Sequence, residues 1–411
     1  MLKNYLKIAV KVLLRQKFFT FVSLFGISIT LTILFVVVAM LDSVFTPGGR
    51  GSKLSRALFI EEISLQGKDW SIGSSPSYSL LDHHVRTLKT PELVAIHTSN
   101  TSTTVYVGDH KVELQLKYTD AAFWDIVEFD FAEGGAYNKS QVDNVEAVAA
   151  ITDRTREEVF GPGPVVGKTI ETTSGNFRIV GVVPQKAMPG QVAYADIWVP
   201  ITQNSQAVTR DEIYGSELAI VLPTPDGDPE AIKKEFEEHL DVVRADLDDR
   251  FDSLACMMGS QFELATPEFA DSPVGGPTII ISIIIGLMIL FMLLPAINLV
   301  NMNVSRIFER SSEIGVRKAF GASAATLVGQ FVVENVVLTL VGGALAVVFS
   351  LLALNILNDS GAIPYAHFRL NTHVLFYSLL ITLFFGVFSG VLPAYRMSRL
   401  HPVEALRGVT T

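Results

Sequence analysis

The sequence predicts an α-helical membrane protein with four transmembrane helices and a large mixed α/β domain outside the cytoplasm. Hydrophobic residues make up 49% of the chain and gather in four long runs, and a helix needs about 20 apolar residues to cross a bilayer. Basic residues cluster beside these runs on one face of the membrane, and a long acidic segment separates the first run from the second.

Each of the four runs is long enough to form a membrane span. We expect spans at 18–41, 277–304, 327–357 and 374–395. Only the third run carries a charged residue, Glu334. A cleaved signal peptide is the alternative for the first run, but the run is too long for one and no small-x-small cleavage site follows it. We therefore expect an uncleaved span.

The basic residues indicate the orientation. They precede the first span, occupy the loop 305–326 and follow the last span in the tail 396–411. Positive charge marks the cytoplasmic side, so both termini are expected there. The segment 42–276 and the short loop 358–373 are then outside, and 42–276 contains 19 Lys and Arg against 37 Asp and Glu. This acidic domain offers no basic stripe to phosphates, which argues against a nucleic-acid partner.

Residues 1–17 precede the first span and carry a cation at every fourth position, namely Lys3, Lys7, Lys11 and Arg15. This spacing puts the cations on one stripe of a helix. We expect a basic amphipathic helix that lies in the inner membrane interface. A plain helical extension of the first span is the alternative.

The outer segment alternates stretches typical of strands with stretches typical of helices. Strands are expected at 57–65, 92–98, 103–107, 111–118, 146–151, 168–172, 177–183, 195–200 and 217–222, and helices at 78–88, 121–127, 153–160 and 229–249. The turn Ser174–Asn176 joins two of the strands. Asp228 is placed to cap the last helix, with Pro229 at the favoured first position.

No residue pattern predicts catalysis, a cofactor or a metal on this chain. Gly167–Lys168–Thr169 resembles the end of a phosphate-binding loop, but Pro162 occupies the first glycine position and the stretch leads from a helix into a strand, the reverse of the required context. His83 and His84 are neighbours and cannot share a helix face. Cys256 is the single cysteine, so an intrachain disulfide is excluded.

The cytoplasmic loop from Ser305 to Ala322 reads SRIFERSSEIGVRKAFGA. Its charges at 306, 309, 310, 313 and 317 share one helical face, and Glu313 and Arg317 form a favourable i,i+4 pair. Gly321 is placed to end the helix. The residues alone leave two interpretations open: a helix that docks on a partner, or a solvated loop helix anchored by snorkelling cations.

Three stretches resemble the permease subunits of MacB/FtsX-type ABC transporters. They are ERSSEIGVRKAFGAS from residue 309, the closing segment PAYRMSRLHPVEALR, and the outer stretch 123–183 with FWDIVEFDFAEGG, VVGKTI and FRIVGVVP, which is similar to the family's periplasmic core domain. The resemblance covers most of the chain. It implies an outer domain of two subdomains, the second inserted at about 119–215.

The resemblance also implies partners. Such permeases pair with a second copy or a paralogous permease and bind cytoplasmic ABC ATPase subunits, which hold ATP and Mg. In MacB the ATPase domain precedes the permease on one chain, whereas this sequence starts at the basic helix, so we expect a separate ATPase. The expected coupling residues are Glu309, Arg310, Glu313, Ile314, Gly315, Arg317, Lys318, Gly321 and Ala322. A periplasmic adaptor, an outer-membrane channel and membrane lipid are further expected partners.

The expected function is that of a non-enzymatic permease subunit in a bacterial inner membrane, which transmits ATP-driven motion to its outer domains. Export or extraction of a peptide, drug or lipid-like substrate would follow. The alternatives are an FtsX-like regulator of an outer partner such as a cell-wall hydrolase, and a sensor, which the short tail disfavours. For Glu334 we expect a structural or coupling role, because no second intramembrane carboxylate accompanies it as a proton relay would require.

Overall fold

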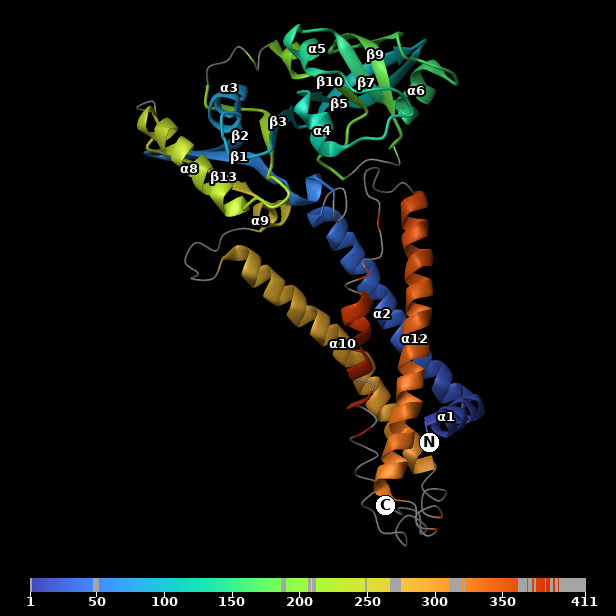
Figure 1. Ribbon diagram of the computed structural model, residues 1–411. Coiled ribbons are helices and arrows are strands. Elements are labelled where there is room, and N and C mark those ends of the chain that lie inside the picture. Colours follow the sequence, from blue (N-terminus) through green and yellow to red (C-terminus); the bar gives the residue numbers. More distant parts are fainter. Residues whose placement is uncertain are drawn as a thin grey trace. The chain divides into compact units, whose positions relative to one another are not determined.

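A computed structural model describes residues 2–46, 52–185, 190–205, 208, 212–247, 250–266, 275–309, 316, 320, 323–360, 368, 372, 375–380, 382–384, 387, 388 and 391. The chain forms two compact units, which are described separately below (Figure 1). The membrane unit contains Met1–Leu41 and Thr278–Ala362, and the outer unit contains Asp42–Pro277.

The membrane unit consists of helices. Those with described bounds are α1 (Leu2–Arg15), α2 (Lys17–Phe45), α10 (Gly276–Glu309) and α12 (Ala324–Ser360). α1 is a helix of its own that packs against α12, so residues 2–15 are not a plain extension of α2. Its place in the membrane interface stays a prediction.

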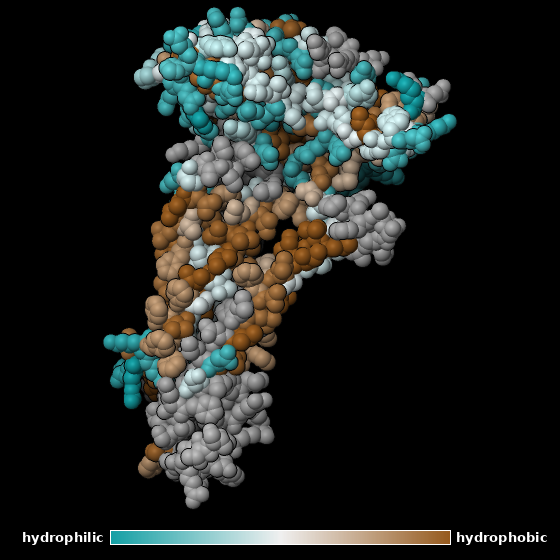
Figure 2. All heavy atoms as spheres, turned by 180° about the vertical axis from the view of Figure 1, so that it is seen from behind, coloured by the Kyte–Doolittle hydropathy of each residue, from teal (hydrophilic) through white to brown (hydrophobic). Residues whose placement is uncertain are grey.

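Two helical stretches, Lys17–Ser43 and Val328–Ser360, are long and apolar enough to cross a membrane. Only 33% of the most apolar window of each is buried, whereas the core helix of a soluble protein would be mostly buried. Figure 2 accordingly shows apolar surface along the helices. Shorter apolar stretches, Gly276–Phe291 and Leu375–Phe384, lie at the second and fourth expected spans. The described residues thus support two spans, and the total of four stays a prediction.

The outer unit is built on a mixed sheet. The strands in spatial order are β11 (Tyr214–Gly215), β2 (Trp70–Pro76), β1 (Leu58–Gly67), β12 (Glu217–Leu222), β3 (Leu93–Thr98), β5 (His110–Thr119), β10 (Ile197–Pro200), β7 (Val148–Thr152), β9 (Gly175–Val183) and β6 (Glu133–Gly134). β13 (Ser253–Gly259) pairs with β1, β4 (Thr101–Val107) with β5, and β8 (Thr169–Thr172) with β9. Only β5–β10 and β7–β9 are parallel among the described pairs. A single register pair, His97 with Thr119, joins β3 to β5.

Short helices connect and cover the strands. They are η1 (Leu54–Arg56), α3 (Tyr78–Leu80), η2 (Leu81–Val85), α4 (Ala122–Val127), α5 (Lys139–Asp143), α6 (Asp153–Phe160), η4 (Ile201–Gln203), α8 (Pro229–Ala245) and α9 (Gln261–Ala265). The expected cap of α8 is confirmed, since the Asp228 side chain accepts from the backbone N–H of Glu230. α8 buries four residues at helical spacing, Ile232, Phe236, Leu240 and Val243.

Most expected strands and helices are confirmed within two residues, with some corrections. The strands β2, β6, β11 and β13 were not predicted. β6 and β11 have two residues each, β2 reads WSIGSSP, which lacks apolar alternation, and β13 is rich in small residues and Met. α8 ends at Ala245 rather than at 249. The turn between β8 and β9 is Thr173–Ser174, because Thr172 pairs with Gly175. The helix expected at 78–88 becomes a π-helix from Leu81 to Val85.

Two hydrophobic clusters fill the outer unit. One contains Phe59, Phe123 and Trp198, and the other contains Leu116, Phe177 and Ile197. Trp198 and Ile197 are neighbours on β10, and successive side chains of a strand point to opposite faces of the sheet. The clusters therefore lie on opposite faces of the sheet at β10, and this central strand is buried on both sides.

Candidate coupling site and the outer junction

The expected coupling segment begins where α10 ends, at Glu309. The other eight expected coupling residues lie outside the described residues: Arg310, Glu313, Ile314, Gly315, Arg317, Lys318, Gly321 and Ala322. Within the same segment, Phe320 is 88% exposed, and its backbone N–H donates to the Val316 carbonyl at 3.1 Å.

Glu334 lies on α12 and is only 2% exposed. Gln330, one helical turn earlier, donates from Nε2 to Oε1 of Glu334 at 2.9 Å. The adjacent Asn335 is equally buried. A buried carboxylate that faces protein agrees with the general expectation for ionisable groups in spans. The amide partner was not predicted from the sequence, although Gln330 and Glu334 have i,i+4 spacing.

α12 packs closely on α2 in the membrane unit. A Cβ built on Gly342 would lie 2.7 Å from Cγ2 of Ile27, which is 1% exposed. Four residues further along α12, the Ala346 carbonyl accepts from Thr32 Oγ1 at 3.4 Å. Small residues permit such close approach of membrane helices. α2 and α12 are therefore in direct contact through small and polar groups.

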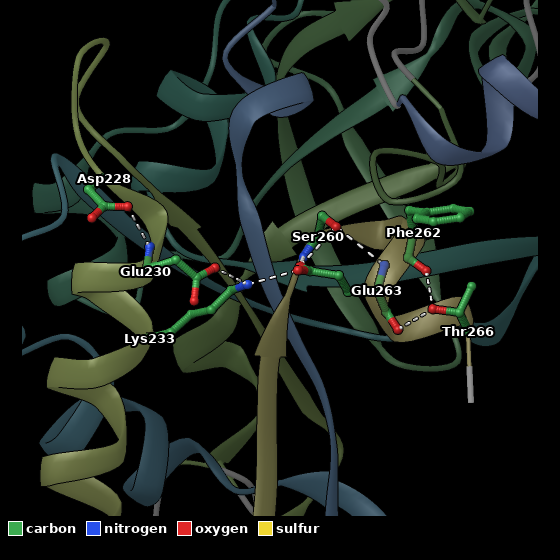
Figure 3. Close-up of polar contacts among 7 residues, drawn as sticks. All are labelled: Asp228, Glu230, Lys233, Ser260, Phe262, Glu263 and Thr266. Atoms are coloured by element: carbon green, nitrogen blue, oxygen red, sulfur yellow. Dashed lines mark hydrogen bonds and ion pairs between the residues drawn. The ribbon is translucent and has the colours of Figure 1, made fainter. Parts of the chain in front are cut away.

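A junction in the outer unit was missed by the sequence analysis. It is centred on α9, shown in Figure 3, which begins with a reciprocal cap. The Ser260 hydroxyl accepts from the backbone N–H of Glu263, and Oε2 of Glu263 accepts from the backbone N–H of Ser260 at 2.7 Å. The sequence signal was available, because Ser-x-x-Glu is the pattern of a capping box.

Glu263 also binds outside its own helix. Its Oε1 lies 2.9 Å from Nζ of Lys233 in α8, and the same ammonium lies 2.8 Å from Glu230 (Figure 3). Burial alone would raise the pKa of Glu263, but the hydrogen bonds from Lys233 and Ser260 outweigh it, so this pKa is lowered. Glu263 is therefore a carboxylate at neutral pH.

Comparison with known proteins assigns both parts of the chain. Residues 20–239 match the MacB-like periplasmic core domain, and residues 278–402 match the FtsX-like permease C-terminal domain. The chain belongs to the MacB/FtsX-type permease family. The second match includes the coupling segment and Glu334, so these residues lie in the permease portion of this MacB/FtsX-type permease.

Several curated relatives are similar to this MacB/FtsX-type permease. The macrolide export ATP-binding/permease protein MacB of Shewanella oneidensis is 25% identical over 98% of this chain and 60% of the relative. MacB of Burkholderia thailandensis is 27% identical over 69% of this chain and 41% of the relative. The ABC transporter permease YvrN of Bacillus subtilis is 24% identical over 71% of this chain and 70% of the relative. The chain thus spans less than two thirds of these MacB relatives.

Solved structures are similar to part of the chain. The periplasmic region of MacB from Actinobacillus actinomycetemcomitans has a TM-score of 0.38 and 15% identity, over 50% of this chain and 89% of that one. The extracellular domain of the transporter YknZ from Gram-positive bacteria has a TM-score of 0.36 and 13% identity, over 48% of this chain and 99% of that one.

Proposed function

We propose that this chain is the permease subunit of an ABC transporter, in which a cytoplasmic ABC ATPase drives a conformational change of the outer domain. The observation that carries the proposal is the order of the two matched regions: a periplasmic core domain is followed in the same chain by the FtsX-like permease domain. ATP and Mg would bind the partner ATPase, and this chain would supply no catalytic group.

The coupling segment supports a docking role. It connects α10 to α12, so a partner bound there acts on both helices at once. Phe320 offers an exposed ring, and the residues Glu309, Glu313 and Arg317 offer charges of both signs. Apolar residues anchor many docked helices, and complementary charges near them in the sequence add specificity.

Transmission of motion suits these helices better than a polar channel. No charged residue occurs in α10 between Gly276 and Ser305, and Glu334 is the one charged residue in the apolar stretch of α12 from Val328 to Leu357. An aqueous path for a polar solute needs polar lining, which these stretches do not supply. The permease would therefore move its outer domain to act on a substrate presented outside the membrane.

The remaining assignments belong to the same proposal. The permease would reside in a bacterial inner membrane with both termini in the cytoplasm, and would pair with a second copy or a paralogous permease. A periplasmic adaptor and an outer-membrane channel are candidate partners. Peptides, drugs and lipid-like molecules are the substrate classes, and drug-like compounds should be tested first because the MacB relatives carry the name macrolide export proteins.

Affinity purification of the tagged chain from its native membranes in mild detergent tests the proposal. We expect a stoichiometric ATP-binding subunit to copurify, and Glu313→Arg to remove it. Glu238→Arg, a charge reversal at an exposed residue of α8 in the outer unit, is the matched control and should retain the complex. Docking through Glu313 is wrong if complex and ATPase coupling survive Glu313→Arg. Copurification of an outer hydrolase that responds to ATP without any transport would instead favour the regulator.

A further inference from the structure

α9 is a helix of five residues whose side chains contact three different elements of the outer unit. Phe262 packs edge-to-face on Phe45, with ring centroids 5.0 Å apart. Gln261 donates from Nε2 to Oε1 of Glu61 in β1 at 2.8 Å. Glu263 binds Lys233 of α8 at 2.9 Å. A helix this short has little stability of its own, so these contacts hold it in place.

The contacts of α9 lie where the two membrane-flanking segments of the chain enter the outer unit. Phe45 is the last residue of α2, the helix of span one. Thr266 follows α9, and its hydroxyl donates to the carbonyls of Phe262 and Glu263 at 3.0 and 3.1 Å (Figure 3). α10, which leads into span two, begins at Gly276. α9 therefore contacts the end of one span-forming helix and precedes the other in the chain.

The ion pair between α9 and α8 is partly shielded from solvent. The side chains of Lys233 and Glu263 are 21% and 34% exposed, whereas Glu230, the second partner of Lys233, is 74% exposed. Partial burial makes a hydrogen-bonded charge pair stronger than an exposed one, because water screens it less. Of the two pairs made by Lys233, the pair to α9 is therefore the stronger mechanical link.

We infer that α9 couples the end of α2 to the body of the outer domain, with Phe262 and Glu263 as positioning residues. Motion at the end of α2 reaches α9 through the Phe45–Phe262 contact, and α9 passes it to α8 through the Glu263–Lys233 pair. The adjacent β1 receives it through Gln261 and Glu61. This inference rests on the proposed function, since it names the residues through which ATP-driven motion reaches the outer domain.

Three variants test the Glu263–Lys233 ion pair without disturbing the helical fold of α9. Glu263→Gln removes the charge and keeps the reciprocal cap, because Gln is also a capping-box residue. Lys233→Met removes the same pair from the side of α8 and leaves the cap intact. Glu230→Gln is the matched control, since it removes the other partner of Lys233 without touching α9.

The experiment is hydrogen–deuterium exchange of the full chain in complex with its copurified ATPase, with and without ATP and vanadate. In the parent protein we expect the nucleotide to change the exchange of α8. Glu263→Gln and Lys233→Met should abolish this change while complex formation, basal ATPase rate and exchange of the buried strands β7 and β9 stay the same. Glu230→Gln should preserve the change. Phe262→Ala, which breaks the contact to α2, should abolish it as well, and Phe262→Leu should retain part of it.

This design distinguishes failure of the inferred role of α9 from failure of the proposed function. A nucleotide response of α8 that persists in both Lys233→Met and Phe262→Ala overturns the role of α9 and leaves the permease function standing. Absence of a copurifying ATPase, or of any nucleotide response in the parent protein, overturns the proposed function itself. Loss of protection in β7 and β9 would show that a variant has lost its fold, in which case α9 would be a stabilising element rather than a coupling one.

Discussion

Gly342 of α12 and Ile27 of α2 approach so closely that a Cβ on Gly342 would lie 2.7 Å from Cγ2 and 3.0 Å from Cβ of Ile27. Ile27 belongs to the hydrophobic cluster of the membrane unit, together with Leu31, Phe35 and Ala346. A β-branched side chain in a helix has little rotamer freedom with which to yield. The close contact of α2 and α12 therefore depends on a glycine at 342.

Gly342→Ala should destabilise the membrane unit by about 1–3 kcal/mol, the usual cost of overpacking a close contact. Thermal unfolding in detergent measures the effect. Gly286→Ala in α10 is the matched control, because a Cβ there meets nothing within 4 Å and should leave the melting temperature unchanged or raise it. Equal melting temperatures for the Gly342 and Gly286 variants would show that the close contact is not maintained.

Glu334→Gln should preserve complex formation and ATPase coupling, because an amide can still accept the hydrogen bond from Gln330. Glu334→Leu removes this acceptor and should cost about 1 kcal/mol of stability. ATPase activity of the complex as a function of pH checks the prediction. A proton relay requires a titratable group, so complete loss of coupled activity in Glu334→Gln alone would indicate a relay and contradict a structural role.

Lys117 should make the outer unit more stable as the pH rises above neutral. It lies on β5, is 3% exposed and donates from Nζ to the Val192 carbonyl. Burial lowers the pKa of Lys117 from 10.5 to about 7, with the Glu61 carboxylate opposing this shift. Between these values the unfolded chain holds a proton that the folded chain lacks, so the free energy of unfolding increases with pH, by at most about 1.4 kcal/mol per unit.

Urea unfolding at pH 7 and 9, followed by a probe in the outer unit, measures this slope. Lys117→Met should reduce it and should stabilise the protein most below pH 7, where the buried amine is charged in both states. Lys111→Met, at an exposed position of the same strand, is the control and should keep the slope. An unchanged pH dependence in Lys117→Met would refute the shifted pKa.

Val145→Asn should stabilise the outer unit by about 1 kcal/mol, because the left-handed backbone region is unfavourable for β-branched residues and tolerated by Asn. Val145 has a φ of 55° and is 53% exposed, so little packing is lost. Its carbonyl accepts from Nε2 of Gln203 at 2.8 Å, which helps to hold the conformation. Val166→Asn, at an exposed valine without positive φ, should not stabilise. Thermal unfolding of both variants measures the effect, and a lower melting temperature for Val145→Asn than for the parent protein contradicts the prediction.

The sequence by itself determined the features that depend on neighbouring residues. Long apolar runs located α2 and α12, Asp228 marked the start of α8, and alternation located strands such as β12, since each is set by a local period or a cap. The expected coupling segment and Glu334 were also singled out from the sequence, by charge pattern and by family resemblance, and their coupling role stays a prediction. β2 was not predicted because its Ser and Gly residues give no alternation of apolar and polar positions. Its place in the sheet comes from pairing with its neighbour β1.

Only the tertiary structure decided which distant residues meet. Gln261 and Glu61 are 200 positions apart, and Thr32 and Ala346 are 314 apart, yet each pair shares a hydrogen bond. The Phe45–Phe262 contact and the contact of Gly342 with Ile27 also join residues far apart in the sequence. The burial of Lys117 is likewise not visible in the sequence of β5, which shows no unusual pattern at this position. No local pattern records such pairs, because the packing of whole elements brings them together after each has formed.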